Sequence, residues 1–422
     1  MAFPVVETLR SAAVDLLLLP ERWRSGFAYN PFSPKTAQDP YPAYAELRAR
    51  APVYRSRLLQ GWVLTRHADV NAILRDHRRF GSDPRKGTIP ARRRAMLPPA
   101  EEYTMLMLDP PDHTRLRALV NKAFTPRAVA ALEPRIRGTL GALLDEIADP
   151  AAFDLMDCVA RPLPVIVIAE MLGVPPEDRA MFRSWSAKRA RLLEPTIGIR
   201  EWRGGKAAGQ AFDAYFRRVI RERRDSPRDD IVSALLRAQD EGGRLSDRET
   251  LNMLRLLLAA GNETTVNLIG NGVLALLRHP EQLERLRDDP GLIAGAVEEL
   301  LRFDSPVQAD FRRVLVDCEV DGHTLRQREN VVLLLGAANR DPELFQHPDR
   351  LDVGRHARQH VSFGRGIHHC LGAPLARLEG RIALEMLLER FRSIELAGDL
   401  PRFRPGVVLR GLESLPVRCV PA

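Results

Sequence analysis

The sequence predicts a mainly α-helical protein with small β-sheets, and three patterns indicate this. From about residue 113 to 303, apolar residues recur at helical spacing in segments separated by prolines. Short runs with strand-like alternation lie towards the two ends of the chain. No repeat, low-complexity tract or Gly/Ser linker divides the sequence, so we expect one continuous domain.

The composition indicates a globular protein that works in a reducing compartment. With 422 residues and 45% hydrophobic content, the chain can bury a large core without disulfides. Its cysteines, Cys158, Cys318, Cys370 and Cys419, are widely spaced and form no CxxC pair. The apolar stretch 14–19 is far shorter than the about 20 residues of a membrane span. We therefore expect a soluble, cytoplasmic protein without stable membrane insertion.

The charges do not indicate nucleic-acid binding. The net charge is +8, but the 63 basic residues are spread along the chain among 55 acidic ones. A nucleic-acid interface usually concentrates its basic residues on one face. The densest cluster is Arg85, Lys86 and Arg92 to Arg94, in a loop with proline and glycine. This loop is either plain solvated surface or a feature of substrate entry.

An early hairpin and short strands towards the C-terminus are expected. The runs 53–58 and 62–66 alternate around the turn Gln60-Gly61, which predicts a hairpin. Towards the C-terminus, the runs 331–335 and 415–420 are also expected to be β-strands.

The longest helical pattern begins at residue 245 and runs to about 278. Ser246 and Glu249 have the spacing of a capping box at its start. A helix of this length would extend roughly 50 Å. Its middle, residues 259–265, places small and polar residues inside an apolar helix, and glycine there costs about 1 kcal/mol relative to alanine. The segment is either an exposed kink or a local widening over a ligand.

A glycine-rich loop surrounds Cys370. It reads Phe363-Gly364-Arg365-Gly366-Ile367-His368-His369-Cys370-Leu371-Gly372 and leads into a helical pattern. The glycines allow a flat ligand to approach the main chain, and a cysteine at a helix N-terminus is stabilised as a thiolate. Alternatives are a buried packing cysteine or a zinc site. The zinc site would use His356, His360, His368, His369 and Cys370.

This loop resembles the cysteine loop of the cytochrome P-450 family, Phe-Gly-x-Gly-x-His/Arg-x-Cys-x-Gly, at every fixed position. The resemblance implies the P-450 fold, with a long central helix over haem b and the cysteine loop beneath it. Cys370 would be the axial iron ligand, and Phe363, Gly364 and Gly372 would shape the loop against the haem. Residues 31–422 would form a single haem domain without a fused reductase, after an N-terminal extension of residues 1–30.

Further family elements occur in the same order. Glu299 and Arg302 match the Glu-x-x-Arg element, which the resemblance places in a buried network with Arg355. His113 and Arg117 are expected to hold a haem propionate, and Arg312 and His368 align with the other propionate donors. A shift of one residue would exchange Arg312 with Arg313.

The segment 260–265 resembles the family's oxygen-binding helix. Ala260 is then expected to contact the haem. Thr264 would hydrogen-bond the bound oxygen and hold water, while Glu263 would relay protons from solvent.

The resemblance therefore implies a monooxygenase that inserts one oxygen atom from O2 into a C–H or C=C bond of a lipophilic small molecule. Electrons would come from a separate ferredoxin or flavodoxin, docked near Arg115, Lys122, Arg365 and Arg377. The chain is expected to be a monomer. A peroxide-driven peroxygenase and a non-catalytic haem-thiolate sensor are the alternatives, and both are disfavoured by the presence of Glu263 together with Thr264.

Substrate contacts are expected from the loop 81–104, the central helix, the segment after Arg302 and the last hairpin. Their side chains are mostly apolar, and the candidates are Met96, Leu97, Leu257, Val307, Gln308, Phe311, Leu409 and Leu412.

Overall fold

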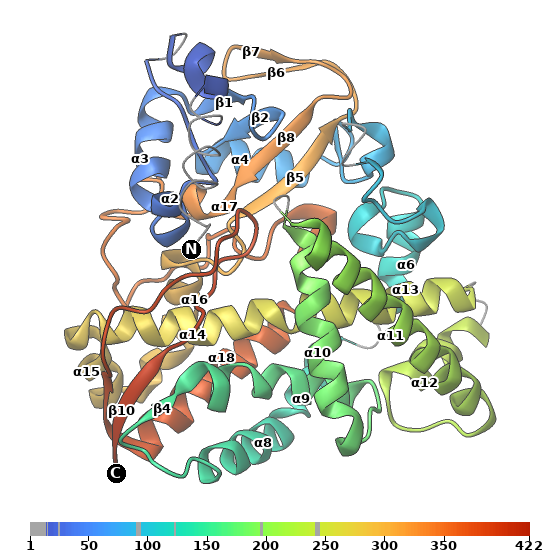
Figure 1. Cartoon of the computed structure of the whole chain (residues 1–422), viewed down its shortest axis with the longest axis vertical. Coiled ribbons are helices and arrows are strands. Elements are labelled where there is room, and N and C mark those ends of the chain that lie inside the picture. Colours follow the sequence, from blue (N-terminus) through green and yellow to red (C-terminus); the bar gives the residue numbers. More distant parts are fainter. Residues whose placement is uncertain are drawn as a thin grey trace.

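The computed structural model describes residues 14, 16–23, 26–89, 94–121, 124–194, 197–240 and 245–422. It is mainly helical with small sheets, as the sequence predicts. Figure 1 shows the larger sheet packed with the N-terminal helices in one part and a layered set of helices in the other. Among the described residues, no helix is long and apolar enough to cross a membrane.

The helices are spread along the whole described chain. They are α2 (Pro34–Gln38), α3 (Tyr41–Arg50), α4 (His67–Arg75), α6 (Asp112–Asn121), α7 (Pro126–Ala130), α8 (Glu133–Asp145), α9 (Pro162–Met171), α10 (Arg179–Ala190), α11 (Ile199–Asp225), α12 (Ile231–Asp240), α13 (Asp247–Gly261), α14 (Glu263–Leu277), α15 (Pro280–Asp288), α16 (Ile293–Phe303), α17 (Leu335–Ala338) and α18 (Ala373–Arg390).

The larger sheet has five strands in the order β1-β2-β8-β5-β3, and only the β2–β8 pair is parallel. Gln60 has the positive φ angle that the predicted tight turn requires, so the first hairpin is confirmed. The predicted strand 331–335 is also confirmed, one residue earlier. The strands are β1 (Val53–Ser56), β2 (Gly61–Leu64), β3 (Phe80–Gly81), β5 (Ala309–Val314) and β8 (Asn330–Leu334).

Two smaller sheets complete the strands. The predicted C-terminal strand is the centre of a three-stranded sheet of order β4-β10-β9. A hairpin of β6 and β7 projects from the larger sheet. These strands are β4 (Phe153–Asp154), β6 (Cys318–Val320), β7 (His323–Leu325), β9 (Phe391–Leu396) and β10 (Pro416–Pro421).

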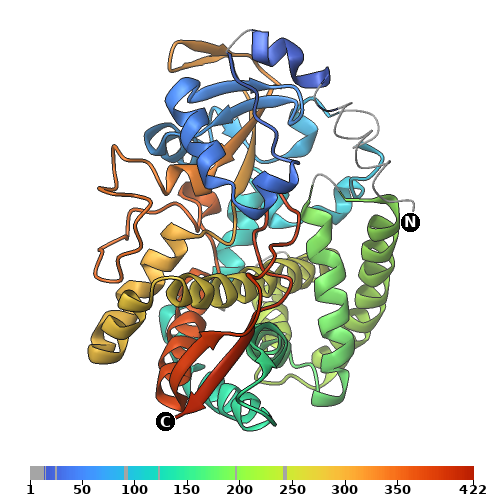
Figure 2. The same ribbon diagram turned by 60° about the vertical axis from the view of Figure 1, so that its left-hand side comes forward.

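The largest hydrophobic core lies in the helical part, where α14 crosses the molecule between α16, α18 and α9 (Figures 1 and 2). The predicted helix 245–278 is not continuous. It begins with the predicted capping box, in which Glu249 N donates to Ser246 Oγ over 3.2 Å, but it breaks at Asn262.

The break is buried, so the interpretation as an exposed kink is wrong. Asn262 is 3% exposed, and its Nδ2 donates to Ser186 Oγ on α10 over 2.8 Å. Two residues later, Thr264 Oγ1 donates to the carbonyl of Ala260 over 2.8 Å. A threonine hydroxyl that bonds the carbonyl four residues earlier bends a helix. The polar residues that looked out of place in the sequence therefore shape this junction.

Candidate functional site

The loop before Cys370 is shaped by two glycines. Gly364 and Gly366 have φ angles of +65° and +68°, a region that side chains with a Cβ rarely enter. A Cβ on Gly366 would also collide with the carbonyl of Leu74 at the end of α4. The loop closes where Cys370 N donates to Phe363 O over 2.8 Å. The glycine spacing seen in the sequence is thus a backbone requirement.

Cys370 lies three residues before the start of α18. Burial raises the pKa of its thiol, while the amides of Gly372 and Ala373 and the cations Arg117 and Arg377 act in the opposite direction. By surface area the residue is nevertheless exposed. Both observations hold if the sulfur faces an internal space, and not the outer surface. Amides and cations that favour the thiolate suit a metal ligand.

Two histidines meet beside this loop. The ring centroids of His113 and His368 lie 4.1 Å apart. Burial lowers the pKa of His113 to about 4 and that of His368 to about 3, with the charge of Arg312 acting in the same direction. At neutral pH both rings are therefore uncharged, and each carries one N–H donor.

The buried donors of this cluster lack partners. In the described part of the chain, both ring nitrogens of His113, Nε2 of His368 and Nη2 of Arg312 make no hydrogen bond. Buried polar atoms are rarely left in this state. Two carboxylates placed here would satisfy them, and a cysteine loop with close glycine backbone suits a flat macrocycle. The donor set therefore fits haem b, with its two propionates.

The two candidate arginines, Arg312 and Arg313, are neighbours on β5 and point to opposite faces of the strand. Side chains alternate along a strand. Arg312 is directed towards His113 and His368, whereas Arg313 lies against Gly87 and donates to the carbonyl of Arg312 over 3.0 Å. Of the two arginines, Arg312 is therefore the one that lies in the cluster with His113 and His368. Its Nη1 donates to Asp310 Oδ1 over 2.7 Å and to the carbonyl of Phe311 over 2.8 Å.

The acid and alcohol of the central helix lie at the buried break. Glu263 is 8% exposed and forms an ion pair with Arg404 of the C-terminal loop. The pair lacks hydrogen-bond geometry, since Glu263 Oε1 remains without a hydrogen bond. Arg404 Nη2 donates to Asn267 Oδ1 over 2.9 Å. Nothing in the sequence pairs Arg404 with Glu263, because the contact joins two distant segments.

The Glu299 network forms as a buried triad. Arg302 donates to both oxygens of Glu299, with Nε to Oε2 at 2.7 Å and Nη2 to Oε1 at 2.8 Å. Arg355 Nε donates to Oε1 over 3.2 Å. Both side chains of the first pair are fully buried. Arg302 also donates to the carbonyls of Asn339, Pro348 and Arg350, so the triad joins α16 to the long segment before the cysteine loop.

The histidines of the zinc alternative do not gather. Among the described residues, no group of three His, Cys, Asp or Glu side chains is placed to hold a metal ion. His360 instead contacts Glu298, with Nε2 to Oε2 at 3.1 Å, and Arg377 pairs with the same carboxylate. The structure thus gives no support to a zinc site.

The expected docking cations are mostly engaged within the protein. Arg115 pairs with Glu249, Arg377 with Glu298, and Arg365 donates to the carbonyls of Arg358 and His360. Lys122 lies outside the described residues. In the loop 81–104, Arg85 pairs with Asp83 and Lys86 with Asp109, while Arg92 and Arg93 lie outside the described residues.

Among the substrate candidates, Gln308 and Phe311 need correction. Gln308 Nε2 donates to Tyr41 Oη over 3.2 Å and to Ser305 O over 2.8 Å. Phe311 packs in the aromatic cluster of the N-terminal helices, on the face of β5 opposite Arg312. Both were expected to contact the substrate, but their contacts are with the N-terminal helices and the segment after α16.

The other candidates do not all come together. Val307 and Leu409 pair in an isolated antiparallel β-bridge between the segment after α16 and the C-terminal loop. Leu257 and Leu412 belong to the main hydrophobic core. Met96 and Leu97 are half-buried, and the carbonyl of Met96 accepts from Trp202 Nε1 over 3.1 Å.

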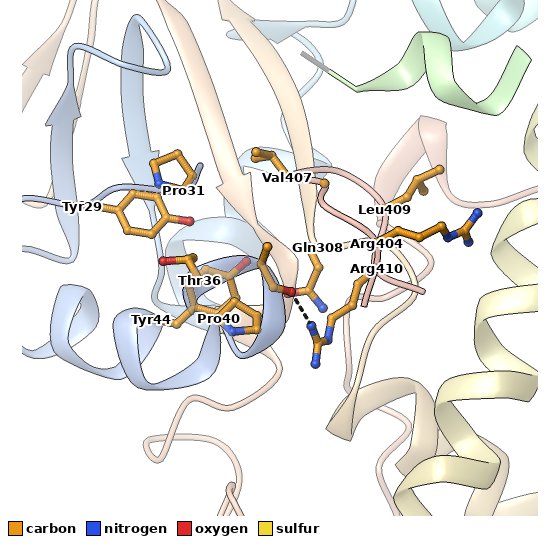
Figure 3. A pocket seen from close by; sticks show the side chains of 12 residues that line it. Tyr29, Pro31, Thr36, Pro40, Tyr44, Gln308, Arg404, Val407, Leu409 and Arg410 are labelled. Carbon is orange, nitrogen blue, oxygen red and sulfur yellow. Dashed lines mark hydrogen bonds between the residues drawn. The ribbon is translucent and has the colours of Figure 1, made fainter. Parts of the chain in front are cut away.

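Figure 3 shows a pocket between the N-terminal helices and the C-terminal loop, with Tyr29 and Tyr44 on one side and Val407 and Leu409 on the other. It offers only about 10 Å³ to a water-sized sphere, which is close to the requirement of one water molecule. It is therefore too small for a lipophilic substrate.

Comparisons with known proteins agree with this geometry. The family model of cytochrome P450 matches residues 38–290 and 291–411. The polyketide biosynthesis cytochrome P450 PksS of Bacillus subtilis is 41% identical over 403 residues, covering 92% of this chain and 98% of that protein. The vitamin D(3) 25-hydroxylase of Pseudonocardia autotrophica is 46% identical over 396 residues, covering 92% and 96%. A myxobacterial cytochrome P450 solved in complex with myristic acid has a TM-score of 0.84 at 41% identity, covering 92% and 98%.

Proposed function

Since the chain belongs to the cytochrome P450 family and is a monooxygenase, we propose that Cys370 ligates its haem iron and that Glu263 and Thr264 deliver protons to the reacting oxygen. The substrate is a lipophilic small molecule. We further propose that residues 31–422 act as one haem domain in the cytoplasm.

The observation that carries these assignments is the set of unpaired buried donors on His113, His368 and Arg312 beside the Cys370 loop. When bound, haem with a thiolate ligand supplies the oxygen activation. Arg312 and the neutral His113 and His368 would hold the propionates, with Arg117 as a further cation close to Cys370. Amide donation from Gly372 and Ala373 would moderate the charge on the Cys370 sulfur.

Thr264 and Glu263 have distinct tasks in proton delivery. The Thr264 hydroxyl hydrogen is directed to Ala260 O, so its Oγ1 lone pairs are left to accept from a water molecule. Thr264 would thus orient that water beside the reacting oxygen. The Glu263 carboxylate lies one residue earlier and would pass protons inward from solvent. Its ion pair with Arg404 keeps the carboxylate at the helix break.

We propose a separate ferredoxin or flavodoxin as the electron donor. Because Arg115, Arg365 and Arg377 make contacts within the protein, reversing their charge would also break those contacts. The cleaner test is the rate of reduction of the unaltered protein as salt is raised. A rate that falls with ionic strength supports an acidic donor. A constant rate contradicts electrostatic docking.

For the substrate, we propose that Leu257, Val307, Leu409 and Leu412 form part of the apolar wall. They come from the central helix, the segment after α16 and the C-terminal loop. The relatives named above include a vitamin D(3) hydroxylase and an enzyme solved with myristic acid. A long-chain fatty acid and a sterol-like molecule are therefore the first probes to try.

The experiment that tests this function compares two ways of supplying oxygen. Haem-loaded protein is incubated with myristic acid or vitamin D3, either with O2, NADPH and a surrogate ferredoxin and reductase, or with hydrogen peroxide alone. Hydroxylated product from the reductase system supports the proposal. Product from peroxide alone would identify a peroxygenase. A ligand-dependent spectral change without product in either case would favour the sensor.

A further inference from the structure

Glu194 binds the backbone of the C-terminal loop. It lies between α10 and α11, and its buried carboxylate accepts three N–H groups, from Val407 and Leu409 over 2.8 Å and from Val408 over 3.3 Å. We propose that Glu194 fixes the turn of residues 406–409 and thereby determines which position of the substrate is oxidised. This inference rests on the proposed function, in which Leu409 forms part of the substrate wall.

The turn is built around this carboxylate. Three successive amides that converge on one anion form a concave donor site, and bonds to a charged acceptor are stronger than neutral ones. Glu194 is 3% exposed, so water does not replace it readily. A Cβ on Gly406 would lie 2.8 Å from Glu194 Oε1 and 2.6 Å from Leu409 O. The close approach of the acid therefore also requires glycine in the turn.

The opposite side of the turn is held by the segment after α16. Gln308 N donates to Val408 O over 2.8 Å, and Arg410 N donates to Pro306 O over 2.9 Å. These bonds enclose the bridge between Val307 and Leu409. The turn is thus held between the segment that joins α16 to β5 and the α10–α11 connection. Of these two sets of bonds, the set to the segment after α16 is between backbone groups, and the set to Glu194 is to a side chain.

The residues on both sides of this turn lie next to α14. A Cβ on Gly411 would collide with Asn267 of α14, one helical turn after Glu263, and Arg404 reaches Glu263 itself. A shift of the turn would therefore move Leu409 relative to the reacting centre. Since misplacement by about 1 Å can change a rate by about 100-fold, small shifts would redistribute oxidation among neighbouring carbons.

The test uses haem-loaded full-length protein with myristic acid as the probe. Glu194→Gln keeps the size of the side chain but loses the charge and one acceptor, while Glu194→Asp keeps the charge but shortens the reach. Leu409→Ala probes the turn itself. Glu177→Gln is the matched control, because it makes the same charge change at an exposed site beside α10. The readouts are the ratio of hydroxylated positions, the dissociation constant from spectral titration, and hydrogen exchange at residues 406–410.

We expect Glu194→Gln to change the ratio of hydroxylated positions by about fivefold or more and to speed hydrogen exchange in the turn. Its haem content should be normal. Leu409→Ala should change the same readouts. The product ratio of Glu194→Asp should lie between those of the unaltered protein and Glu194→Gln. If Glu194→Gln does not fold, Glu194→Asp takes its place in the test. An unchanged ratio and affinity in the Glu194 variants, with Leu409→Ala effective, would overturn the inference. If Leu409→Ala is also without effect, the proposed substrate wall fails and the inference fails with it.

Discussion

Arg404, in the C-terminal loop, forms an ion pair with Glu263 at the break between α13 and α14. The acid proposed to deliver protons is thus tethered by a residue from another part of the chain. The same guanidinium bonds Asn267, so it spans one turn of α14. Proton delivery by Glu263 should therefore depend on Arg404.

Substitution Arg404→Gln should slow turnover. A buried carboxylate that loses its ion-pair partner is harder to hold in place. We expect product formation to fall by about tenfold, equivalent to about 1.4 kcal/mol, with little change in substrate affinity. Steady-state kinetics with a surrogate ferredoxin system check this. Arg404→Lys should recover part of the rate, and equal rates in all three proteins would show that Glu263 acts without Arg404.

Substitution Thr264→Ala should leave haem binding intact but divert reducing equivalents to peroxide, because the water that Thr264 orients is lost. The ratio of product to NADPH consumed is the measurement, with hydrogen peroxide assayed in parallel. Thr265→Ala is the matched control, since Thr265 is the buried neighbour on the same helix. Unchanged coupling in Thr264→Ala would refute the assigned role.

Much of this site could be predicted because it depends on local sequence. The cysteine loop needs its glycines at Gly364 and Gly366, and the Ser246 cap needs Glu249 three residues later. The break at Asn262 could not be placed, since helical spacing continues on both sides of it. The contacts of Glu263 with Arg404 and of Glu194 with the C-terminal turn join segments whose proximity only the folded chain creates. Phe311 lies on the face of β5 opposite Arg312, and Gln308, just before that strand, bonds Tyr41; sequence position alone fixes neither contact.

The Glu299–Arg302 pair should be essential for a stable fold. Removing one partner of a fully buried pair leaves an uncompensated charge and costs about 3–5 kcal/mol. Arg302→Lys should behave similarly, because an ammonium cannot make the two parallel bonds to Glu299. Soluble yield and the unfolding midpoint report the effect. Arg285→Lys, at a largely exposed pair with Asp352, is the control and should have nearly the unfolding midpoint of the unaltered protein. Equal losses of stability in Arg302→Lys and Arg285→Lys would contradict the prediction.

Glu379 should make stability fall as pH rises. Burial raises the pKa of its carboxyl to about 8, against about 4.3 in an unfolded chain. Its stability contribution is therefore full below about pH 4.3 and is lost progressively up to about pH 8, by an amount on the order of 5 kcal/mol. Glu379→Gln cannot ionise, so its stability relative to the unaltered protein should increase between pH 5 and 8. Denaturant unfolding at these two values checks it, with Glu389→Gln at an exposed site of α18 as the control. A pH-independent difference would contradict the buried-acid account.

The most direct test of the account is the absorption spectrum of the reduced, haem-loaded protein with carbon monoxide. If Cys370 is the thiolate ligand, the main band should lie at the long wavelength that gives the family its name, and Cys370→His should move it to the shorter wavelength of histidine-ligated haem proteins. A short-wavelength band in the unaltered, folded protein, or a long-wavelength band that survives Cys370→His, would contradict the assignment of Cys370.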